Sequence, residues 1–333
     1  MKISGVTLTG GIKLNTSAGP GPTPSGPSKF VVGAYQDDSG RGSAYVYNTD
    51  GTGELKIVAS DAATSDWFGY SVAISDTKVV VGARRDDDLG DNSGSAYVYN
   101  ADGTGEVKIT ASDGAIGDQF GWSVAISDTH IVVGTPDNDD AGGDSGSVYV
   151  YNTDGTGEVK ITASDGAADD NFGRSVAVSD THVVVGAQGD NANQGSVYVY
   201  NLDGTGEQKI TASDGAQNDF LGSSVAISAT KVAVGSPYND EGSTRNSGAV
   251  YVYNLDGTGE QKITASDGAT NDQFGGSVAI SDTKVVVGAP FNDDAGDNSG
   301  SVYVYNLDGT GELKIVASDG VAGDQFGGSV AAS

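Results

Sequence analysis

The residues that most suggest chemistry are aspartates gathered in two loops. They are Asp137, Asp139, Asp140 and Asp144 in one loop and Asp293, Asp294 and Asp297 in the other. Carboxylates on flexible loops are the hard oxygen ligands that Ca²⁺ prefers, although neither cluster has the spacing of an EF-hand. Asp and Asn also stabilise tight turns by bonding their own backbone. The sequence therefore makes Ca²⁺ a candidate ligand and implies no required cofactor.

Catalytic arrangements are less well supported. A third set of aspartates recurs before every Phe-Gly pair or its variant, at Asp66, Asp118, Asp170, Asp219, Asp272 and Asp324. A catalytic site needs one asymmetric group of residues, so we expect these six equivalents to accept backbone hydrogen bonds. His130 and His182 stand where other copies have Lys. We predict no enzyme, with paired carboxylates for glycoside hydrolysis left open in so acidic a chain.

Charge and composition exclude several function classes. The 333 residues carry a formal net charge of −28 and no cysteine. The negative field disfavours nucleic acid and anionic membranes, and no cysteine is present for a disulfide or a thiol nucleophile. No apolar run is long enough to insert in a membrane, and "MKISGVTLTGGIKL" has no recognisable signal peptide. We expect a virion or extracellular surface location.

The acidic loops are positioned by an internal repeat of about 50 residues. Six copies of "GS(A/V)YVYN" or its variant begin at Gly42, Gly94, Gly146, Gly195, Gly248 and Gly300. Each full unit has four short β-branched and aromatic runs, here positions A to D: "SVAIS", "VVVGA", "GSVYVYN" and "KITAS". Short turns join them, and we expect no helix. The pattern predicts an all-β, six-bladed β-propeller of four-stranded antiparallel blades.

The two ends of the repeat array are incomplete in a complementary way. The first unit starts at position B with "KFVVGAYQDD", and the last residues, "FGGSVAAS", supply position A without a B. We expect this C-terminal strand to close the ring by joining the first blade. Burial of Phe326 and Val330 would then make deletion of residues 326–333 severely destabilising. The alternative is pairing with the first blade of another molecule.

The strings "DQFGWSVAIS" and "FGGSVAISDTKVVVGAP" resemble the FG-GAP repeats of integrin alpha-subunit propellers and of many bacterial and phage proteins. The resemblance covers residues 30–333 and implies a propeller. Calcium-binding repeats of the integrin type carry a DxDxDG cage between positions A and B. Here that connection is only Ser75 to Lys78 and its equivalents, so the family's calcium residues do not carry over.

Strand direction separates a face of short turns from a face of irregular acidic loops. On the irregular face, the B–C loops and the starts of position A carry aromatic and arginine side chains, which often mediate recognition. These candidate binding residues are Tyr35, Tyr70, Arg84, Arg85, Trp122, Arg174, Tyr238, Arg245 and Phe291. They predict a glycan or protein receptor as partner, unless the side chains merely pack between blades.

The N-terminal region predicts attachment. Residues 1–16 alternate around Gly-Gly like a small hairpin, and residues 17–28 form a Pro/Gly-rich linker to the propeller at 29–333. A short hairpin is marginal alone, so residues 1–16 are expected to dock on another structural protein. We expect a non-enzymatic adhesion module, foremost a phage virion appendage or decoration protein. The alternatives are a secreted or cell-surface bacterial integrin-like adhesin and a polysaccharide-active enzyme.

Overall fold

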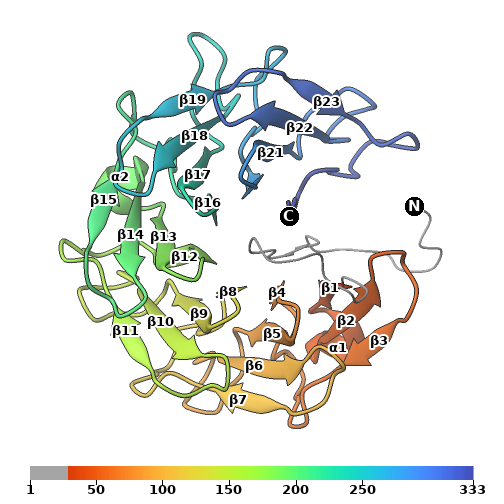
Figure 1. Cartoon of the computed structure of the whole chain (residues 1–333), viewed down its shortest axis with the longest axis vertical. Helices are drawn as coiled ribbons and strands as arrows, with labels where there is room; N and C mark the ends of the chain where they lie inside the picture. Colours follow the sequence, from red (N-terminus) through yellow and green to blue (C-terminus); the bar gives the residue numbers. More distant parts are fainter. Residues whose placement is uncertain (1–28, 333) are drawn as a thin grey trace.

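The computed structural model describes residues 29–332 and confirms the all-β, six-bladed plan (Figure 1). Six antiparallel sheets stand around a common axis, five with four strands and one with three. We name them blade 1 (β1–β3), blade 2 (β4–β7), blade 3 (β8–β11), blade 4 (β12–β15), blade 5 (β16–β19) and blade 6 (β20–β23). The expected hairpin at 1–16 and linker at 17–28 lie outside the described residues.

The strands keep their predicted order within each blade. Position A, nearest the axis, is β4 (Ser71–Ile74), β8 (Ser123–Ile126), β12 (Phe172–Val178), β16 (Ser224–Ile227) and β20 (Ser277–Ile280). Position B is β1 (Lys29–Ala34), β5 (Lys78–Ala83), β9 (His130–Thr135), β13 (His182–Ala187), β17 (Lys231–Ser236) and β21 (Lys284–Ala289). Position C is β2 (Ser43–Asn48), β6 (Ser95–Asn100), β10 (Ser147–Asn152), β14 (Ser196–Asn201), β18 (Ala249–Asn254) and β22 (Ser301–Asn306). Position D is β3 (Leu55–Ile57), β7 (Val107–Ile109), β11 (Val159–Ile161), β15 (Gln208–Ile210), β19 (Gln261–Ile263) and β23 (Leu313–Ile315).

Two helical turns depart from the expectation that the chain contains no helix. They are α1 (Asp37–Gly40) and α2 (Asp190–Asn193), and each contains three residues with positive φ. Both lie in B–C loops of eight residues, whereas the other four B–C loops have 11 or 12. The shorter loops join the same two strand positions with fewer residues, so each forms a single helical turn.

The hydrophobic cores lie between neighbouring blades. Position B is buried on both faces, so β5 carries the unbroken run Val79, Val80 and Val81, all with no exposed surface. Val79 and Val81 pack toward blade 1, and Val80 packs toward blade 3. The Phe or Leu at the corner of each joint from blade 1–2 to blade 5–6 is buried in that joint. Phe68, for example, stands edge-on to the position-C ring of Tyr97 with 5.3 Å between ring centroids.

A polar latch repeats at five joints. In the joint between blades 3 and 4, the Ser164 hydroxyl donates to Glu207 at 2.6 Å. The next residue, Asp165, accepts from the Tyr198 hydroxyl at 2.9 Å and pairs with Lys209 at 2.6 Å. The same aspartate–lysine pair occurs at every joint from blade 1–2 to blade 5–6. The lysines of position D therefore hold neighbouring blades together. Their place on an outer strand also protects that edge from pairing with other chains.

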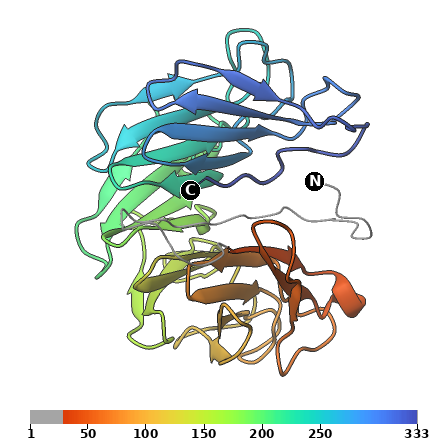
Figure 2. The same ribbon diagram turned by 45° about the vertical axis from the view of Figure 1, so that its right-hand side comes forward.

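The sixth joint differs, and the expected closure by the C-terminal strand is not confirmed. Strand β1 pairs only with β2, and residues 327–332 form no strand. Figures 1 and 2 show blades 6 and 1 standing apart. The corner at Phe326 still docks on blade 6, where Gly327 accepts a hydrogen bond from Ser277 at 2.8 Å. Phe326 itself is 36% exposed, so within the described residues this corner does not seal against blade 1.

The sequence of the last strand explains part of this difference. It reads "SVAAS" where most other copies read "SVAIS", so Ala332 stands at the position of the buried Ile74. Losing three methyl or methylene carbons removes about 2 kcal/mol of hydrophobic burial. Less burial energy is then left to offset the entropy cost of ordering residues 327–332 as a strand on blade 1.

Acid titration is expected to give a stability maximum in mildly acidic solution. Burial tends to raise the pKa of latch aspartates such as Asp113, but hydrogen bonds from Lys160 and Tyr149 outweigh it and lower the pKa. Their contribution is present above the unfolded pKa of about 3.9 and is lost as pH falls through the folded value. Burial raises the pKa of corner aspartates such as Asp118, so folding strengthens as pH falls through that value.

The two limbs can be separated by thermal unfolding of single variants between pH 2 and 7. Asp113→Asn should flatten the loss of stability as pH falls below ~4, and Asp118→Asn should flatten the loss of stability as pH rises above ~4. Each variant should change the pH-dependent part of Tm by at most about 2–4 °C, the shift that about 1 kcal/mol produces in a chain of this size. A Tm that falls steadily from pH 7 downward, identically in both variants, would contradict these assignments.

Candidate binding face

The antiparallel order of each blade gathers the B–C and D–A loops on one face, which we call the loop face. Within it, the backbone amide of Trp67 donates to the carbonyl of Gly40, which joins a D–A loop to a B–C loop. The A–B and C–D turns form the opposite turn face, where Lys78 donates to Asn100. Strand β1 begins on the turn face, since Lys29 lies opposite Asn48 at the C–D turn.

An alternating row of arginine and aromatic side chains crosses the loop face beside the inner strands. Its order is Arg85, Trp67, Arg84, Trp122 and Arg174, and we call it the arginine–aromatic ladder. The Arg85 guanidinium lies 3.6 Å from the Trp67 ring centroid, and that of Arg84 lies 4.6 Å from the same centroid. Arg84 and Arg174 both lie 4.2 Å from the centroid of Trp122. Guanidinium groups at these distances are attracted by the ring quadrupole.

Two tyrosines complete the cluster. Tyr70 lies 4.2 Å from the Arg84 guanidinium and contacts Trp122 edge-on at 5.4 Å between centroids. Tyr35 packs against both Trp67 and Tyr70. The ladder and its tyrosines thus draw on four consecutive blades and their connecting loops. Six of the nine candidate binding residues are brought together here.

Burial makes this cluster electrostatically unusual. Arg84 is only 9% exposed, and burial lowers its pKa. Its Nη1 donates to Gln119, whose amide donates to Asp137, while its buried Nε has no hydrogen-bond partner. Burial also lowers the pKa of Arg174 and raises that of Asp137. Among residues 29–332, Arg84, Arg85 and Arg174 form no ion pair with a carboxylate.

The other three candidates lie outside the ladder. Tyr238 pairs with Phe220 at 5.2 Å between ring centroids. Arg245 is exposed, and Phe291 is half-buried in the blade 6 loop. The loop face therefore has a concentrated site beside blades 1 to 4 and scattered aromatic or basic residues elsewhere.

Sequence reasoning missed Trp67 and Phe220, which both stand immediately before the corner pair. That position has a left-handed backbone in every copy, with φ of 59° at Trp67 and 56° at Phe220. The conformation turns the side chain onto the loop face. Comparing this position among copies gives a usable signal, because Gln or Asn fills it elsewhere.

The candidate calcium aspartates do not gather around one point. Asp140 and Asp294 pair with the latch lysines Lys160 and Lys314. Asp139 and Asp293 accept backbone amides within their own loops, at 2.8 and 2.7 Å. Asp137 accepts a hydrogen bond from Gln119 beside the ladder. Asp144 and Asp297 are exposed and accept amides from the next D–A loop through their backbone carbonyls.

Within residues 29–332, one carboxylate triad has the spacing to hold a cation. Asp61, Asp86 and Asp88 offer oxygens within 4.8 Å of one another. The ammonium of Lys108 already lies among them, 2.7 Å from Asp61 and 3.1 Å from Asp86, and it also pairs with Asp88. The lysine thus supplies the positive charge that a metal ion would bring.

Removing that lysine should create a calcium dependence. Lys108→Ala is expected to lower the free energy of unfolding by about 1–3 kcal/mol, because three carboxylates lose their partner. Millimolar Ca²⁺ should then restore about 1–2 kcal/mol in the variant and leave the wild type unchanged. Chemical unfolding with CaCl₂ or EDTA measures this. Lys284→Ala on the turn face is the control, and equal calcium stabilisation of all three proteins would refute the account.

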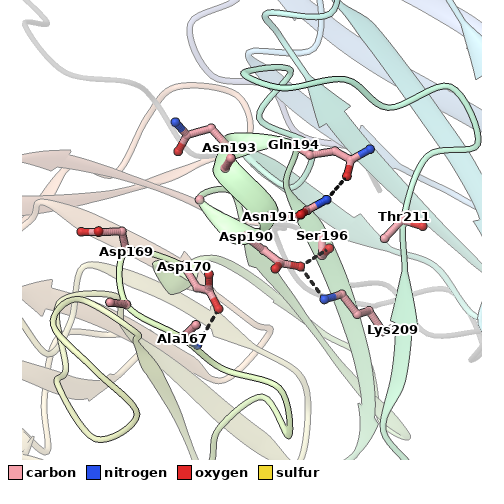
Figure 3. A pocket seen from close by; sticks show the side chains of 13 residues that line it. Ala167, Asp169, Asp170, Asp190, Asn191, Asn193, Gln194, Ser196, Lys209 and Thr211 are labelled. Atoms are coloured by element: carbon pink, nitrogen blue, oxygen red, sulfur yellow. Dashed lines mark hydrogen bonds and ion pairs between the residues drawn. The ribbon is translucent and has the colours of Figure 1, made fainter.

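A cavity of about 610 Å³ opens beside α2 (Figure 3). Asp170, Asp190, Asn193, Gln194, Lys209 and Thr211 are among its lining residues. Asp190 pairs with Lys209, and both point into the space in Figure 3. The short B–C loop of blade 4 leaves this room.

Comparison with known families agrees with this architecture. The FG-GAP repeat model matches residues 52–99, 104–151, 156–200, 205–253, 258–305 and 310–333. The chain belongs to the FG-GAP repeat family. FG-GAP repeats build β-propellers that typically serve as binding or adhesion modules. No curated protein matches this FG-GAP chain. In the part that the structure describes, neither helical turn is long and apolar enough to cross a membrane.

Proposed function

We propose that this FG-GAP propeller is a non-enzymatic adhesion module that binds its target through the loop face. The observation that carries the proposal is the arginine–aromatic ladder. Most side chains of the scaffold repeat around the ring, whereas the ladder occurs once, and its arginines have no carboxylate partner within residues 29–332. Unique aromatic and arginine side chains at a loop face are typical of recognition sites.

The finer proposal is a phage virion appendage or decoration protein. Residues 1–16 would dock on another structural protein, and the Pro/Gly-rich linker at 17–28 would lead to β1. The start of β1 on the turn face supports this polarity, because attachment there leaves the loop face outward. A bacterial surface or secreted adhesin of integrin-like type would use the same arrangement.

Binding of the labelled full chain to candidate host cells tests the adhesion role. Arg84→Gln and Trp122→Ala should each reduce bound protein at least tenfold, the usual loss when an interface anchor is removed. Arg41→Gln is the matched control, since Arg41 lies in a loop of the same face but pairs with Asp38 outside the ladder. Equal binding by all variants would exclude the ladder as the contact.

Attachment and chemistry need separate measurements. Deleting residues 1–16 should abolish incorporation into virions and leave cell binding by the free protein intact. Recovery on bacterial surfaces instead of particles would favour the adhesin alternative. A polysaccharide-active enzyme would release reducing ends from host glycans, and loss of that release on changing one unique carboxylate would replace the non-enzymatic proposal.

A further inference from the structure

The ladder also indicates what kind of group its ligand carries, an inference that rests on the adhesion role proposed above. Two guanidinium groups lie 4.2 Å from the Trp122 ring centroid, which leaves little of that ring for another apolar group. Trp67 has two guanidinium groups at 3.6 and 4.6 Å. The ladder thus offers no open aromatic platform for an apolar peptide side chain.

What the ladder does offer is hydrogen-bond donors. A guanidinium has five N–H donors at its edge, arranged to meet a carboxylate with two parallel bonds. Arg84 uses one nitrogen on Gln119, and its buried Nε has no partner. The side chains of Arg85 and Arg174 make no hydrogen bond to the described part of the chain. An oxygen-rich anion is the group that would satisfy these edges.

The overall charge limits how many anions the ligand can bear. The chain has a formal net charge of −28, and Asp137 is an acidic neighbour of two of the three ladder arginines, Arg84 and Arg174. The field of the whole protein repels a long polyanion, whereas short-range pairing at the ladder can hold one anionic group. The favoured ligand is therefore nearly neutral and carries one acidic group.

We propose that the ladder binds a saccharide with a single carboxylate. The carboxylate accepts hydrogen bonds from Arg84 and Arg174, and Gln119, which bridges Arg84 and Asp137, holds the Arg84 guanidinium in place. Saccharides present many hydroxyl groups and need few apolar contacts, which matches a site with covered rings and free donors. This assigns the ladder to an acidic sugar terminus rather than to a peptide.

Titration calorimetry with sialyllactose and lactose tests the carboxylate directly, because the second sugar lacks only the acidic residue. The wild type should bind sialyllactose at least about tenfold more tightly than lactose. Arg84→Gln and Arg174→Gln should each lose tenfold or more of that affinity. Arg41→Gln should bind like the wild type. Circular dichroism of each variant checks folding, and the less buried Arg174 provides a second variant if Arg84→Gln unfolds.

Four results would overturn the proposal. They are equal affinity for the two sugars, no sialyllactose binding by the folded wild type, an equal loss in Arg41→Gln, and binding only of peptides with a free C-terminal carboxylate. If cell binding still depends on the ladder in these cases, the adhesion role stands and only the ligand class is wrong. If cell binding is also unaffected by ladder variants, both the adhesion role of the ladder and the proposed saccharide ligand are wrong.

Discussion

Replacing Phe172 by Ala is expected to lower the free energy of unfolding by about 3–5 kcal/mol. The same change at Phe326 should cost less than about 1 kcal/mol. Phe172 is 1% exposed and contacts Tyr198 and Tyr200 of blade 4 edge-on, at 5.4 and 6.1 Å between ring centroids. Phe326 occupies the equivalent corner but is 36% exposed, because its corner has no blade to seal against.

Urea unfolding followed by circular dichroism measures both losses. Phe172→Leu is the matched control, since blade 5 is sealed by Leu221, which is 1% exposed at the same position. That variant should lose less than about 1.5 kcal/mol. Equal losses for Phe172→Ala and Phe326→Ala would mean that the last corner packs on blade 1 in solution. The ring would then be closed as the sequence predicts.

The blades could be predicted from sequence because the same strand pattern occurs in six successive repeats. Identical apolar runs separated by Asp/Gly turns leave one antiparallel order that buries position B on both sides. Val80 illustrates the reason, since an unbroken valine run is consistent only with a strand covered by neighbours on either face. Local pattern and global packing agree throughout the repeat array.

Closure could not be settled in the same way, because it depends on a balance of small energies. The complementary partial units predict closure, but strand pairing must outweigh the entropy cost of ordering the segment that contains Ala332. The sequence shows which side chains could be buried, but it does not give the net free energy of burial and ordering. Lys56 is the position-D lysine of blade 1. It pairs with Asp37 of its own blade and not with an aspartate that follows blade 6, so the latch is missing at this joint.

The candidate site was predicted only in part for a related reason. Aromatic and arginine residues on loops could be located, but their alternation across blades depends on contacts between residues as far apart in the sequence as Trp122 and Arg174. Trp122 and Arg84 belong to different repeats, so no local pattern pairs them. Likewise, the acidic loops suggested metal binding, and only the structure shows the lysines that neutralise Asp140 and Asp294.

A close backbone approach between neighbouring blades predicts the second large effect. Gly186 in β13 lies against the carbonyl of Gly222, from the corner that leads to blade 5, and Ser175 donates to that carbonyl at 2.7 Å. A methyl group at Gly186 would overlap that oxygen, and neither backbone can move without opening the joint. Gly186→Ala should therefore lower the free energy of unfolding by about 3 kcal/mol, the upper end for overpacking.

Gly143→Ala provides the control, because a methyl group there meets no atom within 4 Å. Its effect should stay within about 0.5 kcal/mol of the wild type, and both variants can be compared in one urea series. The loss at Gly186 has a steric cause, so Gly186→Ser should be at least as damaging despite its polar group. Tolerance of both substitutions at Gly186 would show that adjacent blades can separate freely, which contradicts a carbonyl-to-glycine contact as the element that sets their spacing.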